Sequence, residues 1–414
     1  MRYSRILAVG TASAILSVAI AGQAMAGVAA AKDQTDPQST GLSVSLDSLT
    51  PVVPKAKDVL QLAGTVTNTS DREIDGANVE LRLSQDRLSS RDQLAKVASG
   101  DETPNTRGVS NGNTEIKSEL APGASASWTL KIPMSDLGLG NSGVYGMRLE
   151  ATSRQDSQVN TSVQTFLPWF PNANSVKPTK VVWLWPLSDW PDRNANNVFL
   201  TDRTPAEVTP VGRLSRVLDL GIAAKEQAEW VVDPQVLQAV NGMTTGYQVA
   251  GQSGTPIPGA STQAASDWIT KARAGLATAS VSATAYAVPD STALNRAKMT
   301  QDVVQATTTS AESVTALLGR PVTSSIGWPP GARTDTKTLS LLQKSGVRTV
   351  ALDNSALLPP SDGSSGAINS AVIRTESGPL AAILTDRVLS TSFGNAGSSA
   401  TDAVLARQRF LAET

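Results

Sequence analysis

The spacing of apolar residues changes near residue 170, and this change sets the fold class that the chain can adopt. From residue 41 to 166, apolar and polar residues alternate with period two, as in Leu42–Leu46 and Val79–Leu83, and turn residues separate the runs. This pattern predicts an antiparallel β-sandwich. From residue 180 onwards, short apolar runs alternate with longer helical segments, which predicts a parallel sheet of the α/β type. We therefore expect a multidomain protein.

The number of strand–helix units in the second part favours a distorted or incomplete (β/α) barrel over a flat doubly wound sheet. The predicted strands are Val181–Trp185, Trp230–Val232, Val281–Ala287, Val322–Gly327, Val347–Leu352 and Leu380–Leu384. The predicted helices are Thr204–Leu220, Thr262–Leu276, Ser291–Leu318, Asp335–Lys344 and Thr401–Glu413. The last helix has no Gly or Pro end signal, so we expect the chain to be the N-terminal portion of a longer protein.

The N-terminus has the layout of a secretory signal peptide. Arg2 and Arg5 precede an uncharged apolar run, and Ala24-Met25-Ala26 offers a small-x-small cleavage site. An uncleaved membrane anchor is the alternative interpretation. For a protein exported to the cell envelope, the expected parts are a signal peptide (1–26), a flexible leader (27–40), an Ig-like β-sandwich (41–166), a linker (167–179) and a barrel-like domain (180–414).

The chain contains no histidine and no cysteine. Their absence excludes Ser-His-Asp and Cys-His catalysis and any zinc site with His or Cys ligands. We expect no metal and no cofactor. The formal net charge of −1 gives no indication of nucleic-acid binding. For an exported protein, these exclusions leave carboxylate chemistry on glycans, or binding without chemistry.

Aspartates follow several of the predicted strands. In a (β/α) barrel the carboxyl ends of the strands gather at one face, so these side chains would converge there. Glycoside hydrolysis needs two such carboxyl groups, one as acid and one as base or nucleophile. An aspartate after a strand is also a common helix N-cap, and Asp233-Pro234 fits a cap followed by a proline at the first helical position, so both roles stay open. The catalytic candidates are Asp189, Asp233, Asp290 and Asp353, and Asp386 occupies an equivalent position.

Aromatic residues accompany these aspartates. Indole and phenol rings beside carboxylates are typical of sites that stack sugar rings, although such rings also fill cores and domain interfaces. The ligand-binding candidates are Trp185, Trp190, Trp230, Tyr286 and Trp328.

Two segments resemble known modules. The run LAGTVTNTSDREIDGANVELRLS (62–84) resembles exported Ig-like modules whose second strand carries G-x-V-x-N. The loop GWPPGA (327–332) resembles the R-P-P-Y/F-G loop of polysaccharide deacetylases, which implies a barrel of the glycoside hydrolase/deacetylase type. Those enzymes bind a metal through an Asp and two histidines, and this chain has no histidine. Trp328 also replaces the arginine of that loop. The resemblance therefore still implies the fold, but it does not imply metal-dependent deacetylation.

Four linked motifs resemble an uncharacterised family of exported actinobacterial cell-envelope proteins: LPWFP…KVVWLWPLSDWPDR, EWVVDPQVL, YAVPDSTAL and GWPPGARTDTKTLSLL. Genes of that family tend to lie beside the gene of a lipid II flippase, and its members look longer and carry a C-terminal membrane helix. The resemblance implies an envelope setting, a membrane anchor in the full-length protein and a link to peptidoglycan assembly. Because the activity of the family is not established, it transfers no catalytic residue.

Three functions stay open. The first is a glycan-binding accessory protein that recognises envelope polysaccharide or peptidoglycan without metal chemistry. The second is a carboxylate-dependent glycosidase acting on envelope glycan, and the third is a scaffold for membrane-bound cell-wall synthesis machinery. Carboxyl groups about 5–5.5 Å or about 6.5–9.5 Å apart would support hydrolysis, whereas aspartates that each cap their own helix would argue against it. The scaffold predicts an exposed apolar patch.

Overall fold

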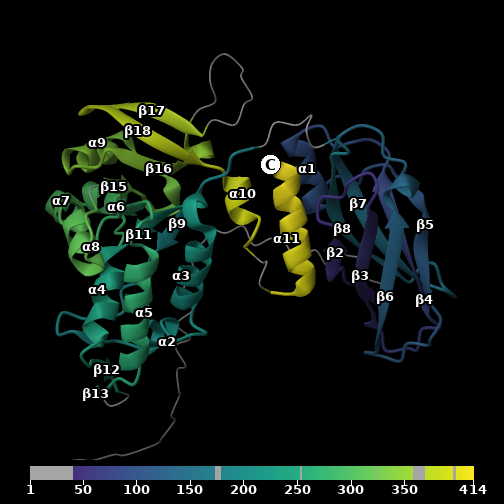
Figure 1. Cartoon of the computed structure of the whole chain (residues 1–414), viewed down its shortest axis with the longest axis horizontal. Coiled ribbons are helices and arrows are strands. Elements are labelled where there is room, and N and C mark those ends of the chain that lie inside the picture. Colours follow the sequence, from purple (N-terminus) through teal and green to yellow (C-terminus); the bar gives the residue numbers. More distant parts are fainter. Residues whose placement is uncertain (1–40, 173–178, 252–253, 323, 358–368, 395–397) are drawn as a thin grey trace, which may run out of the picture.

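The computed structural model describes residues 41–172, 179–251, 254–322, 324–357, 369–394 and 398–414. It consists of an all-β part and an α/β part, with helices α10 (Arg387–Thr391) and α11 (Ala400–Glu413) lying between them (Figure 1). The predicted signal peptide and leader lie outside the described residues. Within those residues, no helix combines the length and the apolar character that crossing a bilayer requires.

Two four-stranded antiparallel sheets form the all-β part. The first sheet consists of β1 (Leu42–Val44), β2 (Ser48–Thr50) and β6 (Ser125–Pro133), all paired with β3 (Val59–Asn68). The second has the order β5–β4–β7–β8, with bounds Thr106–Ile116, Ala77–Ser84, Gly143–Ser153 and Asn160–Trp169. Helix α1 (Arg91–Ser99) follows β4, and a short 3-10 helix, η1 (Met134–Leu137), follows β6.

Alternate residues of these strands point into one shared core. Leu60 and Leu62 of β3 and Leu81 and Leu83 of β4 are buried in the same cluster, while the residues between them are more exposed. The period-two runs of the sequence are therefore strands. Strand β8 continues to Trp169, three residues into the segment predicted as a linker.

The α/β part is built on a seven-stranded sheet with the order β17–β18–β16–β15–β14–β11–β9. The strands are β9 (Trp183–Leu187), β11 (Ala228–Val232), β14 (Val281–Ala283), β15 (Ser324–Gly327), β16 (Thr349–Asp353), β17 (Ser370–Thr375) and β18 (Gly378–Thr385). All neighbouring pairs are parallel except β17–β18. From β9 to β16 the order follows the chain, as in a (β/α) barrel, but β18 pairs with β16 ahead of β17, and the sheet is open, with β9 and β17 at opposite edges. The described residues thus form no closed barrel.

Helices connect the strands of this sheet. They are α2 (Arg203–Glu207), α3 (Arg213–Ala224), α4 (Pro234–Met243), α5 (Thr262–Gly275), α6 (Ser291–Arg296), α7 (Thr300–Thr308), α8 (Ser310–Leu318) and α9 (Thr336–Lys344). Short 3-10 segments are η3 (Lys225–Gln227), η4 (Pro330–Ala332) and η5 (Asn354–Ala356). A separate small sheet contains β10 (Val198–Phe199), β12 (Gln248–Ala250) and β13 (Pro256–Pro258).

Two features of these helices differ from the sequence prediction. The predicted helix Ser291–Leu318 is three helices, because Lys298 takes a left-handed conformation (φ 63°) between α6 and α7. The prediction also contained no helix at α4, although it treated Asp233-Pro234 as a cap followed by a first helical proline.

The two faces of the large sheet differ in what covers them. Trp230 and Val232 point to one face, where residues of α3, α4, α5 and α8 share their cluster. Val231, Ile326 and Ala351 point to the other face, where the cluster contains strand residues and Trp328 but no helix residue.

Helix α11 follows the α/β part in sequence but packs against the all-β part. Val404 belongs to the core of the two β-sheets, and Ala412 packs with Leu94 of α1 and Phe166 of β8. On its other side, the Phe410 ring stacks on Trp183 of β9, with centroids 5.4 Å apart. One helix thus contacts both parts of the molecule.

Arg91 of α1 adds an ionic link between the all-β part and both C-terminal helices. Its guanidinium donates to the Asp386 carboxylate at 2.6 and 3.0 Å and to Glu413 at 2.5 Å. The Glu413 side chain is fully buried. The hydrogen bonds that Arg91 donates to Asp386, together with Glu413, raise the pKa of Arg91 above its ordinary value, so the bridge stays charged.

Arg91→Met should lower the free energy of unfolding, because it removes a charge partner from the buried Glu413. Breaking a fully buried pair costs about 3–5 kcal/mol, and the partial exposure of Arg91 reduces the expected loss to about 2 kcal/mol. Urea unfolding followed by circular dichroism measures it. Lys96→Met on the exposed side of α1 is the control, with an expected change of about 0.5 kcal/mol or less. Equal losses in both variants would show that the bridge does not stabilise the fold.

Candidate functional site

The candidate site lies at what we term the carboxyl edge, the loops that follow the parallel strands β9, β11, β14, β15, β16 and β18. Because parallel strands end at the same edge, residues distant in sequence come together there. All five aspartates singled out in the sequence lie at this edge, directly after a strand, at its last residue or within its loop. What each carboxylate binds decides which role it can take.

Asp233 is the most buried of these carboxylates, with no exposed surface. Its Oδ1 accepts hydrogen bonds from the backbone N–H groups of Gln235 and Ala287, both at 2.9 Å. No donor lies within reach of its Oδ2 in the described residues. Burial raises the pKa of Asp233 to about 6; the two backbone hydrogen bonds oppose this rise, and the negative charge of Asp189 adds to it. Asp233 thus caps α4 and also holds the loop after β14.

The loop held by Asp233 has an unusual backbone. Ala287 and Val288 both take positive φ, 59° and 41°, although neither is a glycine. A β-branched residue in this region is strained, and such strain persists only where surrounding contacts impose it. The hydrogen bond from Ala287 to buried Asp233 is one such contact. This loop is therefore fixed in place rather than relaxed.

Asp189 is held by two arginines. Its Oδ1 accepts from Arg203 at 2.6 Å and from Arg213 at 3.0 Å, and its side chain is almost fully buried. Arg203 also donates to the carbonyl of Trp190 at 2.6 Å, and Arg213 donates to the carbonyl of Ser188. The ion pair therefore braces the loop that carries Trp190, whose side chain remains 68% exposed.

The other aspartates act as helix caps. Asp290 accepts from the Ala293 N–H at 2.9 Å at the start of α6. Asp353 accepts from the Ser355 N–H at 2.8 Å and from its hydroxyl at 2.5 Å. Asp386 caps α10 in addition to binding Arg91; burial alone would raise its pKa, but the Arg91 and backbone hydrogen bonds outweigh burial and lower it. The capping role left open by the sequence is thus realised at Asp233, Asp290, Asp353 and Asp386.

Two of the aromatic candidates lie in the core beneath α3, and the others lie outside it. Trp230 is buried beneath α3 and meets Trp185 edge-on, with centroids 6.5 Å apart. Trp185 donates its indole N–H to the Val217 carbonyl of α3. Gly221 of α3 permits this contact, because a Cβ there would lie 2.5 Å from both indoles. Trp185 and Trp230 therefore belong to the core under α3, while Trp190 and Trp328 lie outside it.

Tyr286 belongs to a polar cluster that the sequence did not indicate. Its hydroxyl donates to Gln238 Oε1 of α4 at 2.6 Å, and Arg193 donates to the same oxygen at 3.1 Å. Arg193 also donates to Asn197 at 2.8 Å. Gln238 and Arg193 were missed because α4 was not predicted and their partners are distant in sequence. The cluster joins the loops after β9 and β14 through α4.

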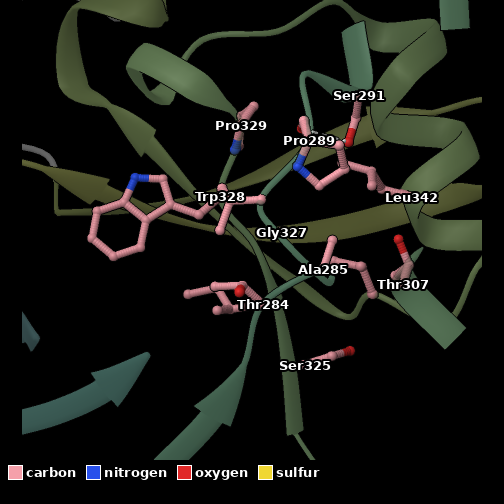
Figure 2. Close-up of a pocket in the computed structure, with 13 residues that line it drawn as sticks. Thr284, Ala285, Pro289, Ser291, Thr307, Ser325, Gly327, Trp328, Pro329 and Leu342 are labelled. Atoms are coloured by element: carbon pink, nitrogen blue, oxygen red, sulfur yellow. Dashed lines mark hydrogen bonds between the residues drawn. The ribbon is translucent and has the colours of Figure 1, made fainter. Parts of the chain in front are cut away.

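A shallow pocket lies between the loops after β14 and β15 (Figure 2). It encloses about 360 Å³, open solvent included, and no titratable side chain lines it. In Figure 2 the Trp328 indole extends to the opposite side from Leu342 and Thr307. The pocket offers apolar surface and hydroxyl groups, but no acid or base. Within the described residues, no group of three or more carboxylates is arranged to hold a metal ion.

A family model matches residues 2–414, and it describes a family of unknown function, DUF6049. The chain belongs to DUF6049. Its membership agrees with the resemblance to an uncharacterised family, while the actinobacterial origin, the flippase link and export stay predictions. No functionally curated protein matches this DUF6049 chain.

Solved structures offer only distant likenesses to this DUF6049 protein. A β-glucosidase from Listeria innocua in complex with glucose has 15% identity and a TM-score of 0.21, covering 31% of this chain and 16% of the enzyme. Spo0M, a sporulation control protein from Bacillus subtilis, has 10% identity and a TM-score of 0.21, covering 31% and 49%. The 272–376 domain of a putative cell surface protein from Methanosarcina acetivorans has 14% identity and a TM-score of 0.20, covering 31% and 91%. Likenesses at this level carry no argument about function.

Asp233→Asn should change how stability depends on pH. The folded-state pKa of about 6 lies above the ordinary value of 3.8, so the folded protein favours protonated Asp233. This contribution is complete below about pH 4 and is lost as the pH rises through about 6; over roughly two pH units it amounts to about 3 kcal/mol. Asparagine keeps the capping oxygen and cannot ionise, so the variant should be more stable than the parent at pH 7 but not at pH 4.

Urea unfolding at pH 3, 4, 5, 6 and 7 measures this difference. Asp335→Asn is the control of opposite sign: Asp335 caps α9 through the Thr338 N–H, and this hydrogen bond, together with Arg296, lowers its pKa. That variant should lose stability at pH 7, and the loss should shrink as the pH falls below 4. A parallel pH profile for Asp233→Asn and the parent would contradict a buried, readily protonated Asp233.

Proposed function

We propose that this protein is an exported glycan-binding protein of the cell envelope that binds sugar chains without hydrolysing them. The observation that carries the proposal is Trp190, an indole 68% exposed at the carboxyl edge on a loop braced by the Asp189–Arg203–Arg213 ion pairs. Binding residues are typically found on loops that a rigid scaffold positions. A flat exposed ring held in this way is suited to stacking on a sugar ring.

The burial, ion pairs and capping hydrogen bonds of the carboxylates favour binding over hydrolysis. A glycosidase needs two carboxyl groups that flank the scissile bond. Asp233 has no exposed surface, Asp189 is held by two arginines, and Asp290 and Asp353 cap helices. These side chains support the loops that present Trp190 and Tyr286, and none of them faces an open cleft as a free acid. The glycosidase alternative therefore has less support.

A protein partner is the second candidate function, as in the scaffold interpretation. Leu200 and Val211 are 54% and 80% exposed and lie on the same long connection between β9 and α3 as Trp190. Exposed apolar side chains in one segment favour a docking surface. The same proposal includes three further points. These are export through residues 1–26, an Ig-like identity for the all-β part and a barrel ancestry for the α/β part.

Trp190→Ala should weaken binding to purified peptidoglycan about tenfold, because losing one stacked ring removes about 1.4 kcal/mol. A co-sedimentation assay with insoluble sacculi measures the dissociation constant. Val372→Ala is the control, since Val372 is similarly exposed but lies on β17, at the opposite edge of the sheet. The control should bind like the parent.

Mass spectrometry of the sacculi after incubation tests the second half of the proposal. No new glycan fragments are expected. Fragments made by the parent and not by Asp233→Asn would establish hydrolysis and overturn the non-catalytic proposal. Absence of sedimentation for the parent would reject glycan binding and favour the protein-partner candidate.

A further inference from the structure

The Arg193–Gln238–Tyr286 cluster differs from the other polar clusters of the carboxyl edge. Its three members come from the loop after β9, from α4 and from the loop after β14. Gln238 Oε1 accepts from both the Tyr286 hydroxyl and the Arg193 guanidinium, so the amide group of Gln238 is oriented by two donors. In the described residues, the nitrogen of this amide has no acceptor, and Gln238 is exposed. The cluster therefore has hydrogen-bond donors available to a ligand.

The charge of Arg193 is not neutralised within the cluster. Arg203 and Arg213, the first residues of α2 and α3, both bind the Asp189 carboxylate. Arg193 instead donates to two neutral amide oxygens, on Asn197 and Gln238. Within the part of the chain that the structure describes, no carboxylate lies within ion-pair distance of Arg193. A half-buried guanidinium held by neutral acceptors keeps its full charge for a ligand.

Hydrogen bonds to Asp233 and packing beside α4 hold the members of this cluster in place. Asp233 caps α4, which carries Gln238, and also holds the Ala287 N–H next to Tyr286. Arg193 lies beside Gly242 of α4, where a Cβ would stand 3.4 Å from its guanidinium. Two of the three members are therefore fixed by one buried carboxylate. A guanidinium held by two acceptors beside an aromatic ring suits an oxyanion attached to a sugar ring.

We infer that this cluster binds an anionic group on the glycan, so that the site selects acidic over neutral sugar chains. The inference rests on the proposed function and names its ligand class. The anion is a carboxylate or a phosphate, since a guanidinium recognises both through the same paired N–H donors. Trp190, on the same loop as Arg193, would stack on a neighbouring ring.

The test uses the parent protein with three forms of the same purified wall material. One is native, one has its carboxyl groups reduced to alcohols, and one has been stripped of phosphodiester-linked polymers with hydrofluoric acid. Parent binding should weaken about tenfold on one of the two treated materials, and the material affected identifies the anion. Undiminished binding to both treated forms would overturn the inference while leaving glycan binding intact. Failure to bind any form would instead reject the proposed function.

Variants then assign the effect to Arg193. Arg193→Gln should bind native and treated material equally and weakly, and Arg193→Lys should recover part of the discrimination. Arg374→Gln on β17 is the matched control, with the same change of charge at the opposite edge of the sheet. Discrimination by Arg193→Gln equal to that of the parent would place the anion elsewhere and overturn the assignment. If this variant misfolds, as near-UV circular dichroism would reveal, Arg193→Lys and the parent comparison still decide the inference.

Discussion

The arrangement of the carboxyl edge depends on one buried carboxylate. Asp233 accepts one hydrogen bond from the first turn of α4 and one from the strained loop after β14, through the same oxygen. Burying a carboxylate is costly, and its raised pKa records that cost. The two backbone hydrogen bonds offset part of it and fix two neighbouring elements relative to each other. The positions of Gln238 and Tyr286 follow from this constraint.

The sequence predicted features that depend on local patterns. Alternation in Val79–Leu83 predicted a strand, and Asp233-Pro234 predicted a cap, because both depend on neighbours along the chain. The open sheet could not be predicted in this way, since closure depends on whether the edge strands meet. The cluster around Arg193 could not be predicted either, because Gln238 lies 45 residues from Arg193 on a helix that was not predicted. The role of Trp230 as core depended on α3 approaching closely at Gly221.

Contacts between residues far apart in the sequence also join the all-β part to the α/β part. Helix α11 follows the α/β sheet in sequence, yet Val404 completes the core of the all-β part. Its Phe410 stacks on Trp183, and Arg91 bridges Asp386 and Glu413. Apolar packing against both parts, together with the ionic link to Arg91, gives this helix one position. Domain boundaries drawn from composition alone assign α11 by its place in the chain, whereas its contacts assign it to both parts.

The arginines between β9 and the first turn of α3 divide into two kinds, and in the proposed function this division separates structure from recognition. Arg203 and Arg213 are neutralised by Asp189 and Glu207 together, and they brace the backbone at Ser188 and Trp190. A neutralised arginine stabilises a loop but offers little charge to a ligand. Arg193 is positioned by neutral acceptors, so its position is fixed without loss of charge. The aspartates first considered as catalysts thus make the edge rigid, and in the proposed function recognition falls to the aromatic and guanidinium groups that they hold in place.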